Sequence, residues 1–214
     1  DDITFNSTFA YASRLVSIDF GNMGAKSFSL TRTFEGCENL QRLHIDDNSE
    51  TSFSIGPYAF YKCSSLSKDE EQCNIFNFIN YDNANLTYTF NEAIIIRDFN
   101  FINPKSLENS FNNSILSDHN ITFTYNNYEN NEYISNSSNK GNILKLTGNL
   151  TLNTYCYNIF GNVYSYTKSI FKKLDISNFN YTNTSNNTTS SRSKSFVDYL
   201  MVDEVVGLET FHES

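Results

Sequence analysis

The chain of 214 residues has no tryptophan, two prolines, eight glycines and few basic side chains. Its 15 lysines and arginines face 24 acidic residues, which gives a formal net charge of −9. This shortage of positive charge excludes a basic stripe that neutralises nucleic-acid phosphates. It also disfavours docking to an anionic membrane surface. We therefore expect no nucleic-acid partner.

Long hydrophobic runs are also missing. The apolar run Ala93–Ile96 is far shorter than the ~20 residues that span a bilayer, so we expect no membrane insertion. The low proline and glycine content, with 14 tyrosines and 19 phenylalanines, argues against a disordered chain, because aromatic side chains can build a core.

The signature motifs of common enzymes do not occur either. There is no Gly-x-Ser-x-Gly turn, Gly-x-Gly-x-x-Gly fingerprint, Walker-type loop or His-Glu-x-x-His pair. Acidic groups gather at Asp46-Asp47-x-x-Glu50, Asp69–Glu71 and Asp203–Glu204, where solvated charge explains them better than calcium binding or paired carboxylates for glycoside hydrolysis. His44 is expected on the solvent side of a strand. We predict no enzyme activity, catalytic residue, metal site or cofactor, and keep a polysaccharide-active β-helix enzyme as a minor alternative.

Four cysteines are present, at Cys37, Cys63, Cys73 and Cys156. They form no Cys-x-x-Cys pair, which disfavours a structural zinc site. Their even number permits two disulfides in three possible connectivities. Buried thiols that pack as small hydrophobic side chains are the alternative.

Asparagine is abundant, with 32 residues, and several begin an Asn-x-Ser/Thr sequon. The sequons lie at Asn6, Asn85, Asn112, Asn120, Asn136, Asn149, Asn180, Asn183, Asn186 and Asn187. Composition alone nearly explains their number. They favour a secreted or cell-surface protein with covalent N-glycans, and a cytosolic Asn-rich protein is the alternative.

Aromatic anchors recur along the first half of the chain. Phe9, Phe34 and Phe60 are spaced by 25 and 26 residues, and each is followed by a small residue at +3 and a leucine at +6. The first two segments continue to apolar residues at +9 and +11. Steps of three suit a helical or 3₁₀ arc, and the final alternation suits a short strand. An arc plus a strand, repeated every 25 residues or so, is the unit of a leucine-rich-repeat solenoid.

Later repeats follow the same frame less regularly. An insertion at 68–72 moves Cys73 and Ile75 into strand positions, and the frame is regular again from Phe90 to residue 101. Strand starts are then expected near residues 18, 43, 73, 99, 121, 144, 174 and 205. We predict a mainly β, leucine-rich-repeat-like solenoid with short parallel strands and short helical arcs. A β-sandwich is the alternative.

One repeat domain is expected to span residues 1–214. Its regular coils cover about 8–101 and irregular, decorated coils cover 102–179. A loop rich in Asn, Ser and Thr follows at 180–195 because this segment has almost no apolar side chain. A terminal coil occupies 196–214.

Two segments, Thr33–Leu43 and Ile55–Leu66, resemble the BspA-like leucine-rich-repeat family of surface and secreted proteins. Both look like that family's Ile-Gly…Ala-Phe…Cys…Leu…Leu unit, and Leu174–Phe179 is similar to its strand-and-exit segment. The resemblance implies a cell-surface or secreted solenoid used for adhesion or binding, without catalysis. In the repeat frame Cys37 and Cys63 hold equivalent positions on successive coils, within the Cα range of a disulfide.

We therefore expect a non-enzymatic extracellular glycoprotein. It either self-associates into a fibre or surface structure, or binds a host or cell-surface protein or glycan as a monomeric adhesin. The alternating segment Asp1–Thr8 resembles a strand able to pair with a neighbouring chain. Tyrosines crowd the middle of the chain and suit an interface, although core filling explains them equally well. They are Tyr125, Tyr128, Tyr133, Tyr155, Tyr157, Tyr164 and Tyr166.

Overall fold

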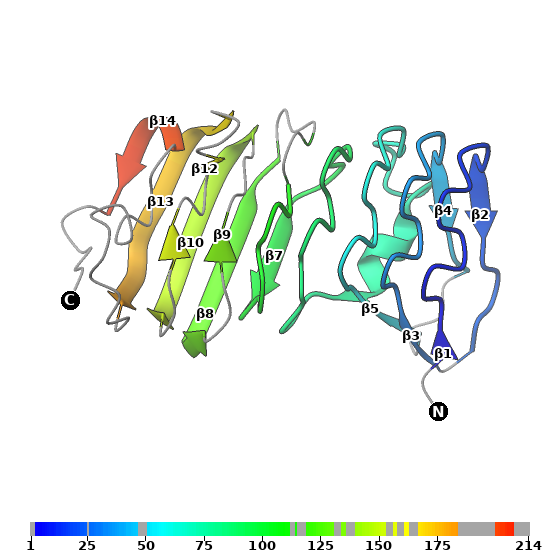
Figure 1. The fold of residues 1–214 in the computed structure, drawn as a ribbon, viewed down its shortest axis with the longest axis horizontal. Coiled ribbons are helices and arrows are strands. Elements are labelled where there is room, and N and C mark those ends of the chain that lie inside the picture. The colour runs from blue at the N-terminus through cyan, green and yellow to red at the C-terminus, as the bar shows by residue number, and fades with distance from the viewer. Residues whose placement is uncertain are drawn as a thin grey trace.

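The computed structural model describes residues 3–24, 26–46, 51–111, 114, 119–130, 134–135, 140–152, 156–157, 161–162, 167–183 and 200–207. Over these residues the protein is mainly β, and its one helix is the short 3₁₀ helix η1 (Asn74–Phe78). The strands lie in a row that runs from the N-terminal to the C-terminal end (Figure 1). No described helix is long and apolar enough to cross a membrane.

The N-terminal half contains two small parallel sheets. One sheet has the order β1 (Ile3–Thr4), β3 (Ser27–Ser29), β5 (Ser52–Ser54) and β6 (Ile79–Asn80). The other pairs β2 (Ser17–Asp19) with β4 (Arg42–His44). The second sheet matches the expected starts near 18 and 43. The first sheet was not expected from the sequence, although Ser-Phe-Ser recurs at 27–29 and 52–54.

The C-terminal half contains one larger sheet with the order β12-β13-β10-β8-β7, with β14 also paired to β13. Its strands are β7 (Phe99–Ile102), β8 (Ile121–Asn130), β10 (Lys140–Leu152), β12 (Gly161–Asn162), β13 (Thr167–Asn183) and β14 (Leu200–Val206). A separate parallel pair joins β9 (Ile134–Ser135) to β11 (Cys156–Tyr157). Among the described pairings only β12 with β13 is antiparallel.

The register of this sheet confirms the expected strand positions. Phe99 pairs with Ile121, and Ile121 with Leu144. Leu144 then pairs with Leu174, which pairs with Val205. The five expected positions thus pair in order, each with the next one on the adjacent strand, across five strands. The reason is that the first four positions supply buried apolar side chains to one face of the sheet, and residues on a common face of parallel strands align.

A column of phenylalanine rings forms the centre of the core. The rings of Phe9, Phe34, Phe60, Phe90 and Phe111 stack in sequence order, with centroid separations of 5.8, 5.4, 5.7 and 5.3 Å. Backbone hydrogen bonds join the same segments: Phe34 N donates to Ala59 O at 3.0 Å, and Phe60 N donates to Thr89 O at 2.9 Å. The anchors expected from sequence therefore lie one above another.

The segment that follows the insertion differs from the expectation. Cys73 and Ile75 are buried as expected, but η1 replaces the strand. The side chain of Asn74 explains the change, because its Nδ2 donates to Ile45 O at 2.8 Å and its Oδ1 accepts from Ile45 N at 2.9 Å. A side-chain amide thus satisfies the backbone groups that a neighbouring strand would pair.

The expected boundaries also change after residue 101. The region expected to be irregular holds the longest strands, and β13 continues through Asn183, so the described start of the 180–195 loop is strand. Residues 184–199 lie outside the described part of the chain. In the terminal coil Val205 is 37% exposed rather than buried, because β14 has a strand neighbour only on its β13 side among the described residues.

Candidate functional site

The arcs between the strands share an unusual backbone conformation. Residues two before and two after the anchor phenylalanines have positive φ. They are Ser7, Arg32, Tyr58 and Tyr88 at 53 to 58° before the anchor, and Tyr11, Gly36, Lys62 and Glu92 at 55 to 72° after it. Non-glycine residues rarely adopt this conformation, which costs about 1–2 kcal/mol each. Its recurrence at two fixed positions indicates that the arc itself requires it.

These positions create a stacked row of side chains across three successive repeats. The guanidinium carbon of Arg32 lies 4.2 Å from the ring centroid of Tyr58. Tyr58 stacks on Tyr88 with a centroid separation of 4.9 Å and an interplanar angle of 1°. Tyr61 meets both tyrosine rings edge-on. We call Tyr11, Arg32, Tyr58, Tyr61 and Tyr88 the arc face.

A buried carboxylate joins two residues of the arc face, Tyr11 and Arg32. Glu35 is only 3% exposed, and it accepts hydrogen bonds from Arg32 Nη1 at 2.9 Å and from the Tyr11 hydroxyl at 2.5 Å. The hydrogen bond to Glu35 raises the pKa of Tyr11 above its usual value, with smaller contributions from partial burial and from the Glu35 charge. Burying this charge is tolerable because both partners compensate it.

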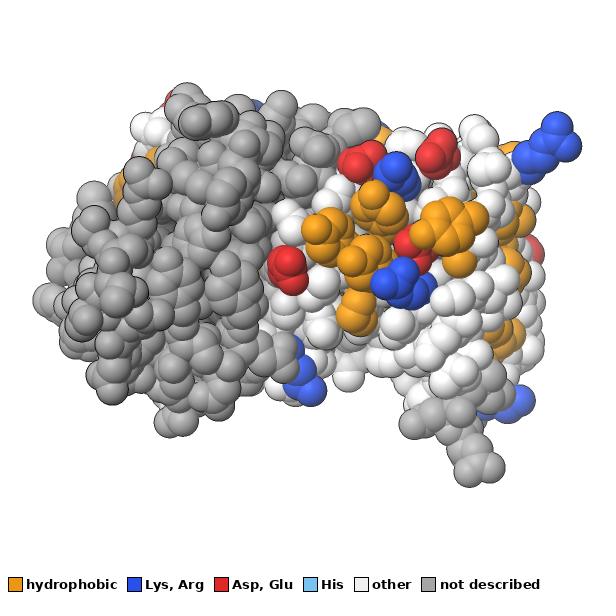
Figure 2. Space-filling model, in the orientation of Figure 1, with side chains coloured by type: hydrophobic (Ala, Val, Ile, Leu, Met, Phe, Trp, Pro, Cys, Tyr) orange, Lys and Arg blue, Asp and Glu red, His pale blue; other side chains and the backbone are white. Residues whose placement is uncertain are grey.

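The residues of the arc face differ in exposure. Tyr11 remains 68% exposed, whereas Arg32 and Tyr88 both pack on the Tyr58 ring. Hydrophobic side chains gather on the visible face of this half of the molecule, with acidic and basic side chains among them (Figure 2). Tyrosine and arginine are the residue types enriched in binding hot spots.

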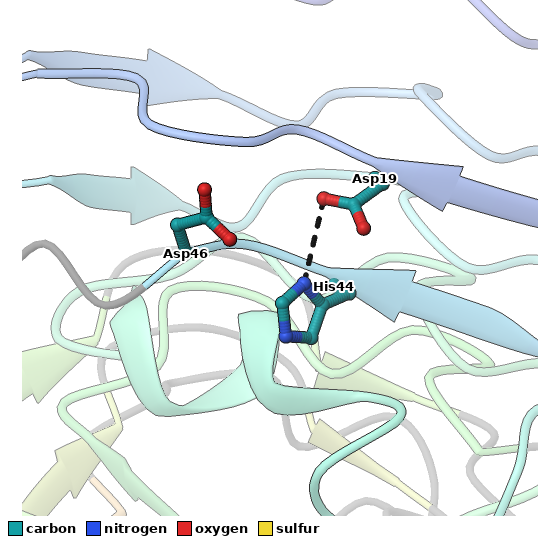
Figure 3. Close-up of side chains that lie close together, drawn as sticks. All are labelled: Asp19, His44 and Asp46. Carbon is teal, nitrogen blue, oxygen red and sulfur yellow. Dashed lines mark hydrogen bonds and ion pairs between the residues drawn. The ribbon is translucent and has the colours of Figure 1, made fainter.

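A second cluster lies at the ends of β2 and β4. Asp19 pairs directly with His44 in the register, and Asp19 Oδ1 lies 3.4 Å from His44 Nδ1. Asp46 completes the group, with one potential ligand atom of each residue within 4.8 Å of the others. One carboxylate oxygen of Asp46 is directed toward the other two side chains (Figure 3).

Hydrogen bonds hold Asp19 in place. Its Oδ1 accepts from Gly21 N at 3.1 Å and its Oδ2 accepts from Arg42 Nη1 at 3.0 Å. The Gly21 backbone N–H, followed by Arg42 and His44, lowers the pKa of Asp19 below its usual range. His44 and Asp46 were singled out from the sequence, but Asp19 was not. The missed signal is that Asp19 precedes His44 by 25 residues, one full repeat.

A second histidine–aspartate pair lies further along the molecule. His119 Nδ1 is 3.4 Å from Asp98 Oδ1, beside a hollow of about 340 Å³ that also touches Glu70, Asn77 and Arg97. Arg97 Nη1 donates to Asn77 Oδ1 at 2.7 Å. Opposite charges thus compensate one another around this hollow.

The structure describes some of the sequons. Asn6, Asn149 and Asn180 are exposed, and Asn85 and Asn120 are half-buried. Asn149 Nδ2 donates to Asn127 Oδ1, and Asn180 Nδ2 donates to Asn149 Oδ1, both at 2.7 Å. Asn183 ends β13 without a described side chain, and the remaining sequons lie outside the described residues. Those are Asn112, Asn136, Asn186 and Asn187.

Cys37, Cys63 and Cys73 are buried free thiols in the structure. The Sγ of Cys37 donates to Phe9 O at 3.1 Å, and that of Cys63 donates to Phe34 O at 3.2 Å. Each of these two thiols thus bonds the backbone of the preceding repeat, and no disulfide joins the three described cysteines. The side chain of Cys156 lies outside the described residues.

The remaining acidic residues and the central tyrosines expected from sequence lie in different surroundings. Asp69 accepts from Glu71 N at 3.0 Å in an exposed turn, and Glu204 Oε1 on β14 lies 3.8 Å from Lys173 Nζ on β13. Asp47 and Glu50 are outside the described residues. Tyr125, expected among interface tyrosines, is 1% exposed and fills the core. The other six central tyrosines have no described side chains.

Comparison with family models, with curated proteins and with solved structures finds no match to this chain.

Proposed function

We propose that this chain is a leucine-rich-repeat-like solenoid that acts as a non-enzymatic structural or adhesive unit at the cell surface. The proposal rests on the parallel pairing of successive strands at Phe99, Ile121, Leu144, Leu174 and Val205. Strands one repeat apart are neighbours, as in proteins whose repeats stack along one direction. The antiparallel pairing of a β-sandwich is the opposite pattern. The resemblance to BspA-like surface proteins supports the same function.

Assembly of copies end to end is the primary function proposed. Strand β1 pairs only with β3 within the described residues. Phe5 N and Ser7 N donate to Ser29 O and Thr31 O on the β3 side. Because alternate residues of a parallel strand bond to opposite sides, the N–H and C=O of Thr4 point away from β3, to the side where no described strand lies. Such an edge is a template for pairing with another chain.

The variant Thr4→Pro tests this assembly. Proline removes the outward N–H, and an edge strand tolerates proline where that N–H faces solvent. Thr4→Val keeps the N–H and serves as the matched control. Sedimentation velocity over a range of concentrations is expected to show concentration-dependent oligomers for the wild type and Thr4→Val but not for Thr4→Pro. A wild-type chain that stays monomeric throughout contradicts the assembly.

Adhesion through the arc face is the second candidate, and the exposed phenol of Tyr11 beside Arg32 and Tyr61 favours it. Tyr11→Ala and Tyr61→Ala are expected to weaken binding to immobilised glycans or to cells. Val205 is an exposed residue of β14, and Val205→Ala is expected to leave binding unchanged. Equal binding by all variants argues against this surface.

Secretion and glycosylation are part of the proposal and have their own test. Material from the native host is expected to lose mass on glycosidase treatment. Glycopeptide mass spectrometry is expected to find sugar on exposed sequons such as Asn6. No mass loss argues against the extracellular glycoprotein. Turnover of a plant or bacterial polysaccharide that Asp46→Ala abolishes would contradict the non-enzymatic assignment.

A further inference from the structure

We infer that Asp19, His44 and Asp46 form a binding site for a divalent transition-metal ion of the Zn²⁺ class. The backbone fixes the relative position of all three residues. Asp19 and His44 are direct register partners on β2 and β4. Asp46 follows His44 by two residues, and its backbone N donates to Gly21 O at 3.1 Å, which ties Asp46 to the chain that leaves Asp19.

The separation of the Asp19 and His44 ligand atoms suits a tetrahedral ion. Two ligands bound to Zn²⁺ at their usual lengths, roughly 2.0–2.2 Å, lie about 3.4 Å apart. The Asp19 Oδ1 to His44 Nδ1 separation is 3.4 Å, which is long for a charge-assisted hydrogen bond, normally ~2.7–2.9 Å. The pair is therefore spaced as ligands are.

The third carboxylate distinguishes this pair from the other one in the chain. His119 and Asp98 have the same 3.4 Å separation, but no third acidic, cysteine or histidine side chain joins them in a metal-ligand group over the described residues. At Asp19 and His44, the Asp46 carboxylate is within 4.8 Å and directed toward the same space (Figure 3). The 3.4 Å separation between histidine and aspartate thus occurs at two pairs. Among the described residues, only the Asp19–His44 pair has a third candidate ligand.

The ligand types favour zinc over calcium or magnesium. Imidazole nitrogen suits Zn²⁺ and its neighbours in the first transition row, whereas Ca²⁺ and Mg²⁺ prefer oxygen ligands. Arg42, which holds Asp19 Oδ2, is 35% exposed and has room to turn toward solvent. Its bond leaves Asp19 Oδ1 facing His44.

The proposed ion would join the first coil to the second. Strand β2 pairs only with β4 within the described residues, so a shared metal adds a link at the end of the stack. Bound metal is therefore expected to stabilise the folded chain, because a ligand that binds the folded state raises its stability by mass action. This inference does not depend on assembly or adhesion.

Calorimetric titration of the full chain with ZnCl₂, with far-UV circular dichroism as a check of folding, tests the site. The wild type and the matched control His119→Ala are expected to bind one equivalent, and the thermal unfolding midpoint is expected to rise with Zn²⁺. His44→Ala and Asp46→Asn are expected to bind at least about tenfold more weakly, since even outer-shell changes cost about 10–100-fold. Asp46→Asn keeps the Asp19–His44 pair, so its effect reports the metal rather than the ion pair.

Two outcomes overturn the inference. One is the absence of zinc binding by the folded wild type. The other is equal zinc binding by the wild type, His44→Ala and Asp46→Asn. Titration with CaCl₂ is expected to give no heat, and calcium binding that Asp46→Asn abolishes while zinc fails to bind would also overturn the assignment to the zinc class.

Discussion

The ring of Phe34 stacks on the ring of Phe60, with centroids 5.4 Å apart and planes 23° apart. These residues are 26 positions apart in the chain and occupy the same place in successive repeats. Their contact is one step in the column that continues to Phe9 on one side and to Phe90 on the other. The spacing of rings along this column is the direct link between the sequence repeat and the fold.

Removing one ring from the column is expected to destabilise the whole stack. Phe60 is fully buried, so Phe60→Ala should lower the free energy of unfolding by about 3–5 kcal/mol, as measured by denaturant titration. Val16 is 49% exposed, and Val16→Ala should change the value by less than about 0.5 kcal/mol. A loss below about 1 kcal/mol for Phe60→Ala would contradict the ring column.

Gly148 is expected to tolerate no side chain. Its φ is +87°, and an added Cβ would lie 1.9 Å from the backbone oxygen of Tyr125 on the neighbouring strand. Gly148→Ala should therefore cost at least about 3 kcal/mol, because the two strands must separate. Gly24 has φ +69° with open space around it, so Gly24→Ala should cost only about 1–2 kcal/mol. Equal costs in urea titrations would contradict the close approach at Gly148.

The sequence predicts which strand residues align because the buried positions are apolar and recur at the spacing of the repeat. Ile121, Leu144 and Leu174 must be apolar to fill one face, and their spacing reveals the register. The first sheet is missed for another reason. The repeat frame assigns one strand to each repeat, after the anchor phenylalanine, whereas Phe28 with Leu30 and Phe53 with Ile55 alternate before it. The 3₁₀ helix at 74–78 is also missed, since it depends on a hydrogen bond between Asn74 and the distant Ile45.

The candidate sites are less predictable for a related reason. His44 has an ordinary place on the solvent side of a strand, and only the register brings Asp19 beside it. The arc face depends on left-handed backbone at Tyr58 and Tyr88, which no propensity of tyrosine predicts. Tyr125 is the opposite error, a residue expected at an interface whose ring is buried in the core. Composition alone cannot distinguish a core tyrosine from an interface tyrosine.

The hydroxyl of Tyr11 should titrate above the usual tyrosine range. The Glu35 hydrogen bond raises its pKa, so the folded state holds this proton more tightly than the unfolded state. The associated stability is present below the unfolded pKa, about 10, and is lost as pH rises through the higher folded pKa. Glu35→Gln should shift the Tyr11 pKa back toward the usual value. NMR of ¹³C-labelled tyrosine, assigned with Tyr11→Phe, measures the shift, and an unchanged pKa in Glu35→Gln would refute the pairing.

The thiols of Cys37, Cys63 and Cys73 should resist reagents in the folded protein. Burial raises the pKa of each thiol, most strongly at Cys63. Because the thiolate is the reactive form, these three cysteines should react with a thiol reagent at pH 8 only after denaturation. Peptide mapping after alkylation identifies each site. A Cys37–Cys63 disulfide in protein kept from oxidants would contradict the structure.

Electron cryo-microscopy of the purified chain at high concentration tests the central claim most directly. If coils stack within each chain and chains continue the stack end to end, filaments should form. Their power spectrum should show a layer line near 4.8 Å along the filament axis, the spacing of neighbouring strands. Monodisperse monomers, or filaments whose ~4.8 Å spacing runs across the axis, would contradict the account.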